Sequence, residues 1–156
     1  MFDHVKFGVS DCAASKAFFI KALEPLGVTV VTESPPNGVE LSQPRGTVSL
    51  CLYQTEERPA HLHLAFTAGS RQQVEAFHRA ALEAGGKDNG APGLRPHYHA
   101  SYYAAIVIGP DGHNIEAVCH ATEGCPCHSR ASTSWLLPLE CALMTNLVRN
   151  PYPAAR

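Results

Sequence analysis

The chain has 156 residues, of which 45% are hydrophobic and 17% charged, and its net charge at neutral pH is −2. This size and composition predict one globular domain with its own core, and the charge gives no support for binding to nucleic acid or to an anionic membrane. No apolar run is long enough to span a bilayer, and the N-terminus lacks the basic and apolar regions of a signal peptide. We therefore expect a cytoplasmic protein.

The first half of the chain reads as a strand, a helix and three more strands. The helix is expected over 14–26, after an N-cap at Ser10 or Asp11 and before a stop at Gly27. β-Branched residues and Pro- or Gly-containing turns mark the strands. These strands are expected at 4–9, 28–32, 39–42 and 47–53.

The second half repeats this order. A strand is expected over 61–66, a helix from a cap at Ser70 to about Ala84, and a closing hairpin over 102–108 and 113–120. The segment from Asp88 to Ser101 is rich in Gly and Pro and is expected to be a long loop.

The two predicted helices carry an internal repeat. Ala17–Glu24 and Ala76–Glu83 are identical at five of eight positions. Because the order of strands around each helix is also shared, we infer two related modules, at about 1–55 and 60–121.

The last predicted strand carries a carboxylate in an apolar setting. It follows the turn Pro110-Asp111-Gly112, and its alternation places Ile115 and Ala117 on one face and Glu116 on the other. A carboxylate there is costly unless an ion or a hydrogen bond compensates it, or unless that face is solvated. Glu116 is thus a candidate metal ligand.

Histidines open two of the other strands on the face that the apolar residues leave free. His4 begins the first strand, and His61 begins the fifth, with His63 facing the same way two residues later. Two histidines and one carboxylate suit a divalent transition metal with open coordination positions.

These stretches together resemble the glyoxalase/bleomycin resistance/extradiol dioxygenase superfamily, also called vicinal oxygen chelate proteins. The resemblance rests on Asp3-His4-Val5 with Val9-Ser10-Asp11, on the strand from His61, and on Gly109–Glu116, and it covers roughly residues 1–121. It implies an α+β fold of two βαβββ modules that form a curled mixed sheet around a metal cleft. The segment 122–156 lies outside the resemblance and is a C-terminal extension of open role.

The resemblance also implies the metal ligands His4, His61 and Glu116, with His63 as the alternative to His61. Counted from the turn glycines, the first module has Leu50 where the second has Glu116, so the chain offers three ligands. A second carboxylate, usual in glyoxalase I-like enzymes, is therefore missing.

Three ligands fit family members that resemble extradiol dioxygenases or fosfomycin-modifying transferases, whose substrates chelate the metal through adjacent oxygens. The resemblance therefore implies a metal-dependent enzyme of dioxygenase, lyase or transferase type that acts on such a small molecule, and Fe(II) or Mn(II) is favoured over Zn or Ni. The alternative is a metal-free protein that binds and sequesters a small molecule, as bleomycin resistance proteins do. We expect a homodimer in either case.

A loop rich in aromatic and basic residues precedes the final hairpin. Histidine and tyrosine can act as general acid or base, and a guanidinium can hold an anionic group. The alternative is that these rings pack on the sheet edge and on a dimer partner. The predicted catalytic residues are His97, His99 and Tyr103, and the predicted substrate-binding residues are Arg95, Tyr98 and Tyr102.

Cysteine usage does not indicate disulfides. Cys51 and Cys119 fall in predicted strands, where a free cysteine behaves as a small hydrophobic residue. Cys125-Pro126-Cys127-His128 has C-x-C spacing, which is not typical of structural zinc sites, so we do not favour a zinc ion there.

Overall fold

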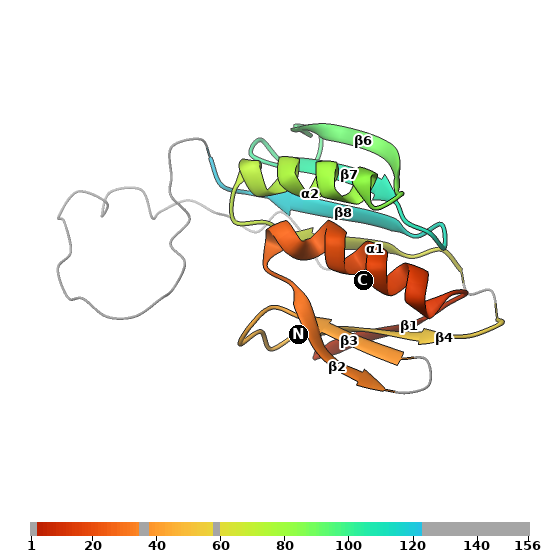
Figure 1. Ribbon diagram of the computed structural model, residues 1–156. Coiled ribbons are helices and arrows are strands. Elements are labelled where there is room, and N and C mark those ends of the chain that lie inside the picture. Colours follow the sequence, from red (N-terminus) through yellow and green to blue (C-terminus); the bar gives the residue numbers. More distant parts are fainter. Residues whose placement is uncertain (1–2, 35–37, 58–59, 123–156) are drawn as a thin grey trace, which may run out of the picture.

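The computed structural model describes residues 3–34, 38–57 and 60–122 (Figure 1). Two βαβββ modules follow one another along the chain, and each forms its own four-stranded mixed sheet. The predicted α+β fold of two such modules is confirmed. The segment Cys125–His128 and most of the C-terminal extension lie outside the described residues.

The first module has its sheet in the order β1-β4-β3-β2, with β1 and β4 parallel. The side chain of Asp11 caps the helix by accepting a hydrogen bond from the Ala14 N–H at 2.9 Å. The last turn expected for this helix is a separate 3₁₀ helix, because Pro25 cannot continue the α-helical hydrogen bonds. The elements are β1 (His4–Val9), α1 (Cys12–Leu23), η1 (Glu24–Leu26), β2 (Thr29–Ser34), β3 (Gly38–Ser42) and β4 (Ser49–Gln54).

The second module repeats this topology with its sheet in the order β5-β8-β7-β6 and with β5 and β8 parallel. The hydroxyl of Ser70 caps its helix by accepting from the Gln73 N–H at 3.2 Å. The elements are β5 (His63–Thr67), α2 (Arg71–Glu83), β6 (Lys87–Leu94), β7 (Tyr103–Ile108) and β8 (Asn114–Cys119).

The loop expected over 88–101 is wrong in its first half, because β6 occupies Lys87–Leu94. This strand lies at the edge of the sheet and pairs with β7 alone, and its register shifts twice, on either side of Gly90. An edge strand with bulges tolerates glycine and also Pro92, whose missing N–H needs no partner on the open side. Composition alone therefore misidentified a strand as a loop.

The two modules share one hydrophobic core. Helices α1 and α2 lie side by side, with β6–β8 on one side of the pair and β1–β4 on the other (Figure 1). Phe18 of α1 reaches the second module, since a Cβ added to Gly109 would lie 3.1 Å from its ring. Phe7 of β1 packs edge-on against His113, with ring centroids 4.9 Å apart. The core thus fixes how the two modules sit against each other.

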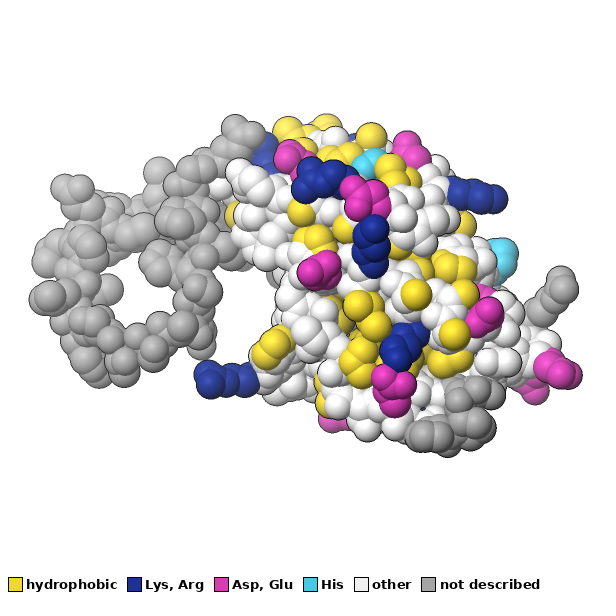
Figure 2. Space-filling view, in the orientation of Figure 1, with side chains coloured by type: hydrophobic (Ala, Val, Ile, Leu, Met, Phe, Trp, Pro, Cys, Tyr) yellow, Lys and Arg dark blue, Asp and Glu magenta, His cyan; other side chains and the backbone are white. Residues whose placement is uncertain are grey.

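The face covered by the two helices carries side chains of both charge signs between hydrophobic ones (Figure 2). Lys21 of α1 and Glu83 of α2 form an ion pair across the helices at 3.3 Å. Among the described residues, no helix is long and apolar enough to cross a membrane.

Candidate functional site

Each sheet packs one face against the core and leaves the other face open. On β8, Ile115, Ala117 and Cys119 lie in the core, while Glu116 projects from the opposite face. On β5, Leu64 packs against the core and His63 faces away from it. The alternation predicted from the sequence therefore holds on both strands.

Glu116 and His63 are brought together on the open face of the second sheet. Glu116 is only 4% exposed, and its Oε2 lies 2.7 Å from His63 Nε2. The hydroxyl of Tyr102 donates to the other carboxylate oxygen, Oε1, at 2.8 Å. Both oxygens of this buried carboxylate are thus compensated by hydrogen bonds.

Two asparagines, linked by hydrogen bonds, fix the orientation of the His63 ring. Asn114 Nδ2 lies 3.0 Å from His63 Nδ1, and Asn114 Oδ1 accepts from Asn89 Nδ2 at 2.9 Å. In this arrangement Nδ1 accepts and Nε2 carries the proton toward Glu116. Turning both amides would place the proton on Nδ1 and leave Nε2 as a lone-pair donor, which is how metal-bound histidines are commonly held.

We call the cavity above this pair the Glu116 hollow; its volume is about 560 Å³. Aromatic rings line it, with centroids 5.3 Å apart for Tyr98 and Tyr102 and 5.1 Å apart for Tyr102 and His120. Burial, and then the hydrogen bond to Glu116 and the charge of that carboxylate, raise the pKa of Tyr102 to about 12. The phenol is therefore a neutral hydrogen-bond donor near pH 7.

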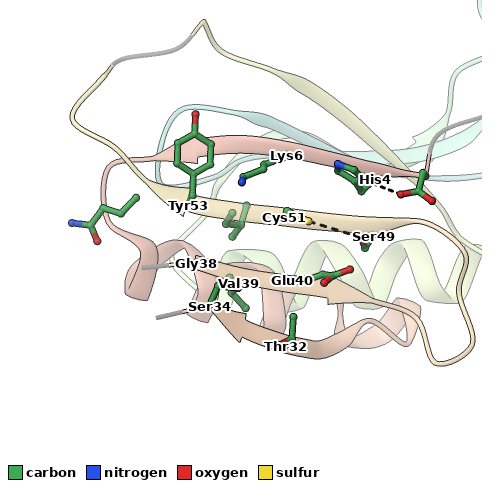
Figure 3. Close-up of a pocket in the computed structure, with 13 residues that line it drawn as sticks. His4, Lys6, Thr32, Ser34, Gly38, Val39, Glu40, Ser49, Cys51 and Tyr53 are labelled. Carbon is green, nitrogen blue, oxygen red and sulfur yellow. Dashed lines mark hydrogen bonds and ion pairs between the residues drawn. The ribbon is translucent and has the colours of Figure 1, made fainter. Parts of the chain in front are cut away.

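The open face of the first sheet has a matching cavity of about 630 Å³, which we call the Cys51 hollow (Figure 3). His4 lines it, with Nδ1 2.8 Å from Asp3 Oδ1. Lys6 lies with its ammonium 5.3 Å from the centroid of the Tyr53 ring. The predicted ligand His4 thus opens into a different cavity from Glu116.

The predicted ligand His61 lies in a third hollow, of about 270 Å³, where the end of β1 meets the turn before β8. A Cβ on Gly112 would lie 2.9 Å from His61 Nε2, so the ring rests directly on this glycine. His113, which lines the same hollow, is buried and accepts a hydrogen bond from the Leu62 N–H at 3.1 Å. The structure therefore separates His61 from Glu116 and places the alternative, His63, beside it.

The same junction contains a dense hydrogen-bond cluster. Asp111 Oδ1 accepts from the N–H of Ser10 at 2.9 Å and from its hydroxyl at 2.6 Å, while Oδ2 accepts from the Ser15 hydroxyl at 2.6 Å. Burial by itself would raise the pKa of Asp111, but these hydrogen bonds outweigh it and lower that pKa below 3.8. The turn before β8 is in this way tied to the start of α1.

The six residues predicted for catalysis and substrate binding divide into two groups. Tyr98, His99 and Tyr102 line the Glu116 hollow. The other three do not line it. The Tyr103 hydroxyl donates to Glu75 at 3.0 Å, and Arg95 donates to the Ala91 carbonyl at 2.8 Å. The His97 ring lies tilted by 48° against the Tyr98 ring, with the ring centroids 4.2 Å apart.

His120, which is not among the site residues predicted from the sequence, also lines the Glu116 hollow. The choice between His61 and His63 had a usable signal in the repeat. The helix caps Asp11 and Ser70 occupy equivalent places in the two modules, and the same number of residues separates His4 from His63.

The expected equivalence of Leu50 and Glu116 is wrong by one residue. His4 pairs with Ser49, and Lys6 pairs with Cys51; in the second sheet His63 pairs with Asn114, and Ala65 pairs with Glu116. Leu50 is 6% exposed and belongs to the core. The residue that matches Glu116 in the first module is therefore Cys51.

No three or more His, Cys, Asp or Glu side chains converge to hold a metal ion in residues 3–34, 38–57 and 60–122. His63 and Glu116 nevertheless offer the nitrogen and oxygen donors that divalent transition metals take, and they already lie within reach of a shared ion. The donor types fit such a metal, and within one chain this pair would supply two of its ligands.

Comparisons with known proteins agree with this architecture. A family model described as the glyoxalase/bleomycin resistance protein/dioxygenase superfamily matches residues 1–117. A solved glyoxalase/bleomycin resistance protein from Albidiferax ferrireducens is 30% identical, with a TM-score of 0.64 over 76% of this chain and 98% of that one. No match was found among the curated proteins.

Two more distant structures show the same fold alone. A glyoxalase/bleomycin resistance protein/dioxygenase family enzyme from Burkholderia phytofirmans is 17% identical, with a TM-score of 0.62 over 76% of this chain and 98% of that one. A lactoylglutathione lyase from Agrobacterium tumefaciens is 16% identical, with a TM-score of 0.59 over 76% and 92%. With its paired βαβββ modules and a family match over three quarters of its length, the chain belongs to the glyoxalase/bleomycin resistance protein/dioxygenase superfamily.

Proposed function

We propose that the protein is a metal-dependent enzyme acting on a small molecule that binds the metal through adjacent oxygens. One observation carries this proposal. A nearly buried carboxylate, Glu116, lies 2.7 Å from a histidine nitrogen at the wall of a cavity large enough for a small substrate.

His63 and Glu116 would hold the metal, and His4 is the third ligand. His63 takes the place expected for His61 because it is the histidine in contact with Glu116. Since His4 opens into the Cys51 hollow of the same chain, a second copy of the protein is needed to bring it to the pair. This arrangement makes the expected homodimer part of the proposal.

Two histidines and a carboxylate favour Fe(II) or Mn(II) over Zn or Ni. When bound, such a metal polarises the substrate oxygens as a Lewis acid. The residues of the chain supply the rest. Tyr102 donates a hydrogen bond that fixes the carboxylate, Tyr98 offers a ring face to the substrate, and His99 or His120 can move a proton at the rim of the hollow.

Metal binding is the direct test. Protein purified without added metal should contain a divalent ion by elemental analysis. At a free metal concentration a hundred times its dissociation constant, the ion should stabilise the fold by about 2.7 kcal/mol, seen as a rise in Tm. Glu116→Gln keeps an oxygen for Tyr102 but loses the negative charge, so it should fold and bind metal weakly. Equal metal content in wild type and Glu116→Gln contradicts the proposal.

A second function has an observation in its favour. Both oxygens of Glu116 already accept hydrogen bonds, from Tyr102 and from His63, so the carboxylate is compensated without an ion. This favours a metal-free protein that binds a small aromatic compound in the Glu116 hollow. This second function is supported if the protein contains no metal, shows no metal-induced rise in Tm, and binds a ligand more weakly after Tyr98→Ala.

The cytoplasmic location and the domain boundary near residue 121 remain predictions.

A further inference from the structure

Three polar side chains form a line across the second sheet, from one edge strand to the other. His63 lies on the edge strand β5, Asn114 pairs with it on β8, and Asn89 comes from the opposite edge strand, β6. Asn89 Nδ2 donates to Asn114 Oδ1 at 2.9 Å, and Asn114 Nδ2 donates to His63 Nδ1 at 3.0 Å. We call these three residues the polar row. Its inner end is the contact of 2.7 Å between His63 Nε2 and Glu116 Oε2.

A bulge in β6 brings Asn89 into the polar row. The register between β6 and β7 shifts between Asp88 and Gly90, so Asn89 is the inserted residue. Asp88 fixes the bulge, because its Oδ1 accepts from the Gly90 N–H at 3.1 Å and lies 2.9 Å from His78 Nε2. β-Bulges are frequent beside functional sites, where they re-aim a side chain. Here the re-aimed side chain reaches past the intervening strand β7 to Asn114.

The polar row has a direction, because an amide presents a donor at one end and an acceptor at the other. With Asn114 Nδ2 facing the ring, Nδ1 of His63 accepts, and the proton of the neutral imidazole lies on Nε2. That proton is donated to Glu116, so neither atom of the pair is free to bind an ion. Reversal of both amides would place the proton on Nδ1, where Asn114 Oδ1 accepts it, and would leave Nε2 with a free lone pair.

We propose that Asn89 and Asn114 are positioning residues that select the tautomer of His63 and thereby set the affinity of the His63–Glu116 pair for a divalent metal. This inference rests on the proposed function. In the closed state the pair is held by its own hydrogen bond, and in the metal-ready state both amides are reversed. Asn89 controls the choice from the exposed end of the polar row, where water can pair with either end of its amide.

Asn89→Asp reverses the polar row through hydrogen bonding alone, because a carboxylate accepts hydrogen bonds and cannot donate them. Asn114 must then turn its Nδ2 toward position 89 and its Oδ1 toward His63. The matched control is Lys87→Gln, which makes the net charge more negative by the same single unit on the same strand. Both replaced residues are exposed, so both variants should fold, and circular dichroism and thermal unfolding check this.

Two readouts separate this role from a structural one. In the metal-free full chain, imidazole ¹⁵N chemical shifts distinguish Nε2–H, Nδ1–H and doubly protonated rings, and His63→Ala assigns the signal. Affinity is measured for Mn(II), which cysteine thiols bind poorly, by electron paramagnetic resonance of the free ion.

We expect the Nε2–H tautomer in wild type and in Lys87→Gln and the Nδ1–H tautomer in Asn89→Asp. Mn(II) affinity should rise about tenfold in Asn89→Asp, since outer partners of metal-bound histidines are worth about 10- to 100-fold. It should change by less than about twofold in Lys87→Gln, because salt screens a single exposed charge. Asn89→Ala, which frees Asn114 to turn either way, should give both tautomers and an intermediate affinity.

The inference is overturned by an Nδ1–H or doubly protonated His63 in the wild type, or by a tautomer that Asn89→Asp leaves unchanged. An equal gain in affinity in Asn89→Asp and Lys87→Gln would show an effect of charge alone and also overturns it. In these cases Mn(II) binding by the wild type leaves the proposed function standing. Reversal of the tautomer with no Mn(II) bound to any of the proteins contradicts the proposed function and the metal-binding part of the inference together.

Discussion

The two hollows share a backbone plan and differ in chemistry. Each lies on the open face of a βαβββ sheet, beside a histidine on the first strand of its module. In the Glu116 hollow a buried carboxylate is held from both sides, by His63 and by Tyr102. In the Cys51 hollow the equivalent residue is a thiol with a weak contact to Ser49.

This difference shows how a duplicated fold can divide a site. The register that sets which residues meet is the same in both sheets, so each module supplies a pair of side chains at the same place. The chemistry at those places is free to differ, because the open faces do not carry the core. In the proposed metal centre the second module would supply His63 and Glu116, and the first would supply His4.

The largest expected effect comes from two separate variants that each place a carboxylate on β4, at Leu50 or at its neighbour Cys51. Leu50→Glu buries an uncompensated charge in the core and should lower the free energy of unfolding by about 3–5 kcal/mol. Cys51→Glu places the same group on the open face and should change it by less than about 1 kcal/mol. Urea unfolding of both variants measures the difference.

Cys51→Glu should also tighten metal binding, since it adds a carboxylate beside His4. The opposite pattern, with Leu50→Glu stable and Cys51→Glu unfolded, would mean that the register assigned to β4 is off by one residue.

The turns before β4 and β8 give a second contrast. Asp111 ties the β8 turn to Ser10 and Ser15, whereas the β4 turn carries Arg45 and Gly46. Because three hydrogen bonds end on this carboxylate, Asp111→Asn should destabilise the protein by about 1–3 kcal/mol near pH 7.

The effect of Asp111→Asn should depend on pH. The folded pKa of Asp111 lies below 3.8, so its stabilisation is present above that value and is lost as the pH falls through the folded pKa. The difference from wild type should therefore shrink from about pH 7 to about pH 3. Ser15→Ala, which removes one of the three donors, should show the same trend with a smaller amplitude. A difference independent of pH would mean that Asp111 acts through packing and not through its charge.

The smallest expected effect concerns the hydrogen bond that Tyr102 donates to Glu116. At the matching position of the first module, the described neighbour of the Cys51 sulfur is the Ser49 hydroxyl. The raised pKa of Tyr102 means that stability contributed by the neutral phenol is full below about pH 10 and is lost as the pH rises to about 12. Tyr102→Phe should cost about 0.5–1.5 kcal/mol near pH 7 and flatten this alkaline decline.

Tyrosinate absorbance follows the same group directly. The last step of the alkaline titration, at about 12, should disappear in Tyr102→Phe and persist in Tyr53→Phe, which alters the other hollow. Persistence of that step in Tyr102→Phe would show that Glu116 does not hold the phenol in its neutral form.

Periodicity and capping residues predicted most of the fold. Alternation on β1, β5 and β8 assigned the core and open faces correctly, and Asp11 and Ser70 began the helices as expected. Strand β6 was not predicted, because its glycines and Pro92 are typical of loops. They are tolerated here because β6 is a bulged edge strand.

The site was harder to predict because strand ends and turn lengths are not fixed by alternation. His61 and His63 share a parity, and their separation appears only when β5 is found to begin at His63. Leu50 was matched to Glu116 by counting from the turn glycines. Two residues separate Gly46 from β4, whereas one residue separates Gly112 from β8, so that count is off by one.

The central claim is that Glu116 and His63, and not His61, hold a metal ion. The most direct measurement is metal bound per chain, by elemental analysis after dialysis against a defined divalent metal, in wild type, His63→Ala and His61→Ala. Both variants replace an exposed histidine and should remain folded by circular dichroism. We predict stoichiometric metal in wild type and His61→Ala and its loss in His63→Ala. Retention of metal in His63→Ala, with or without its loss in His61→Ala, would contradict the claim.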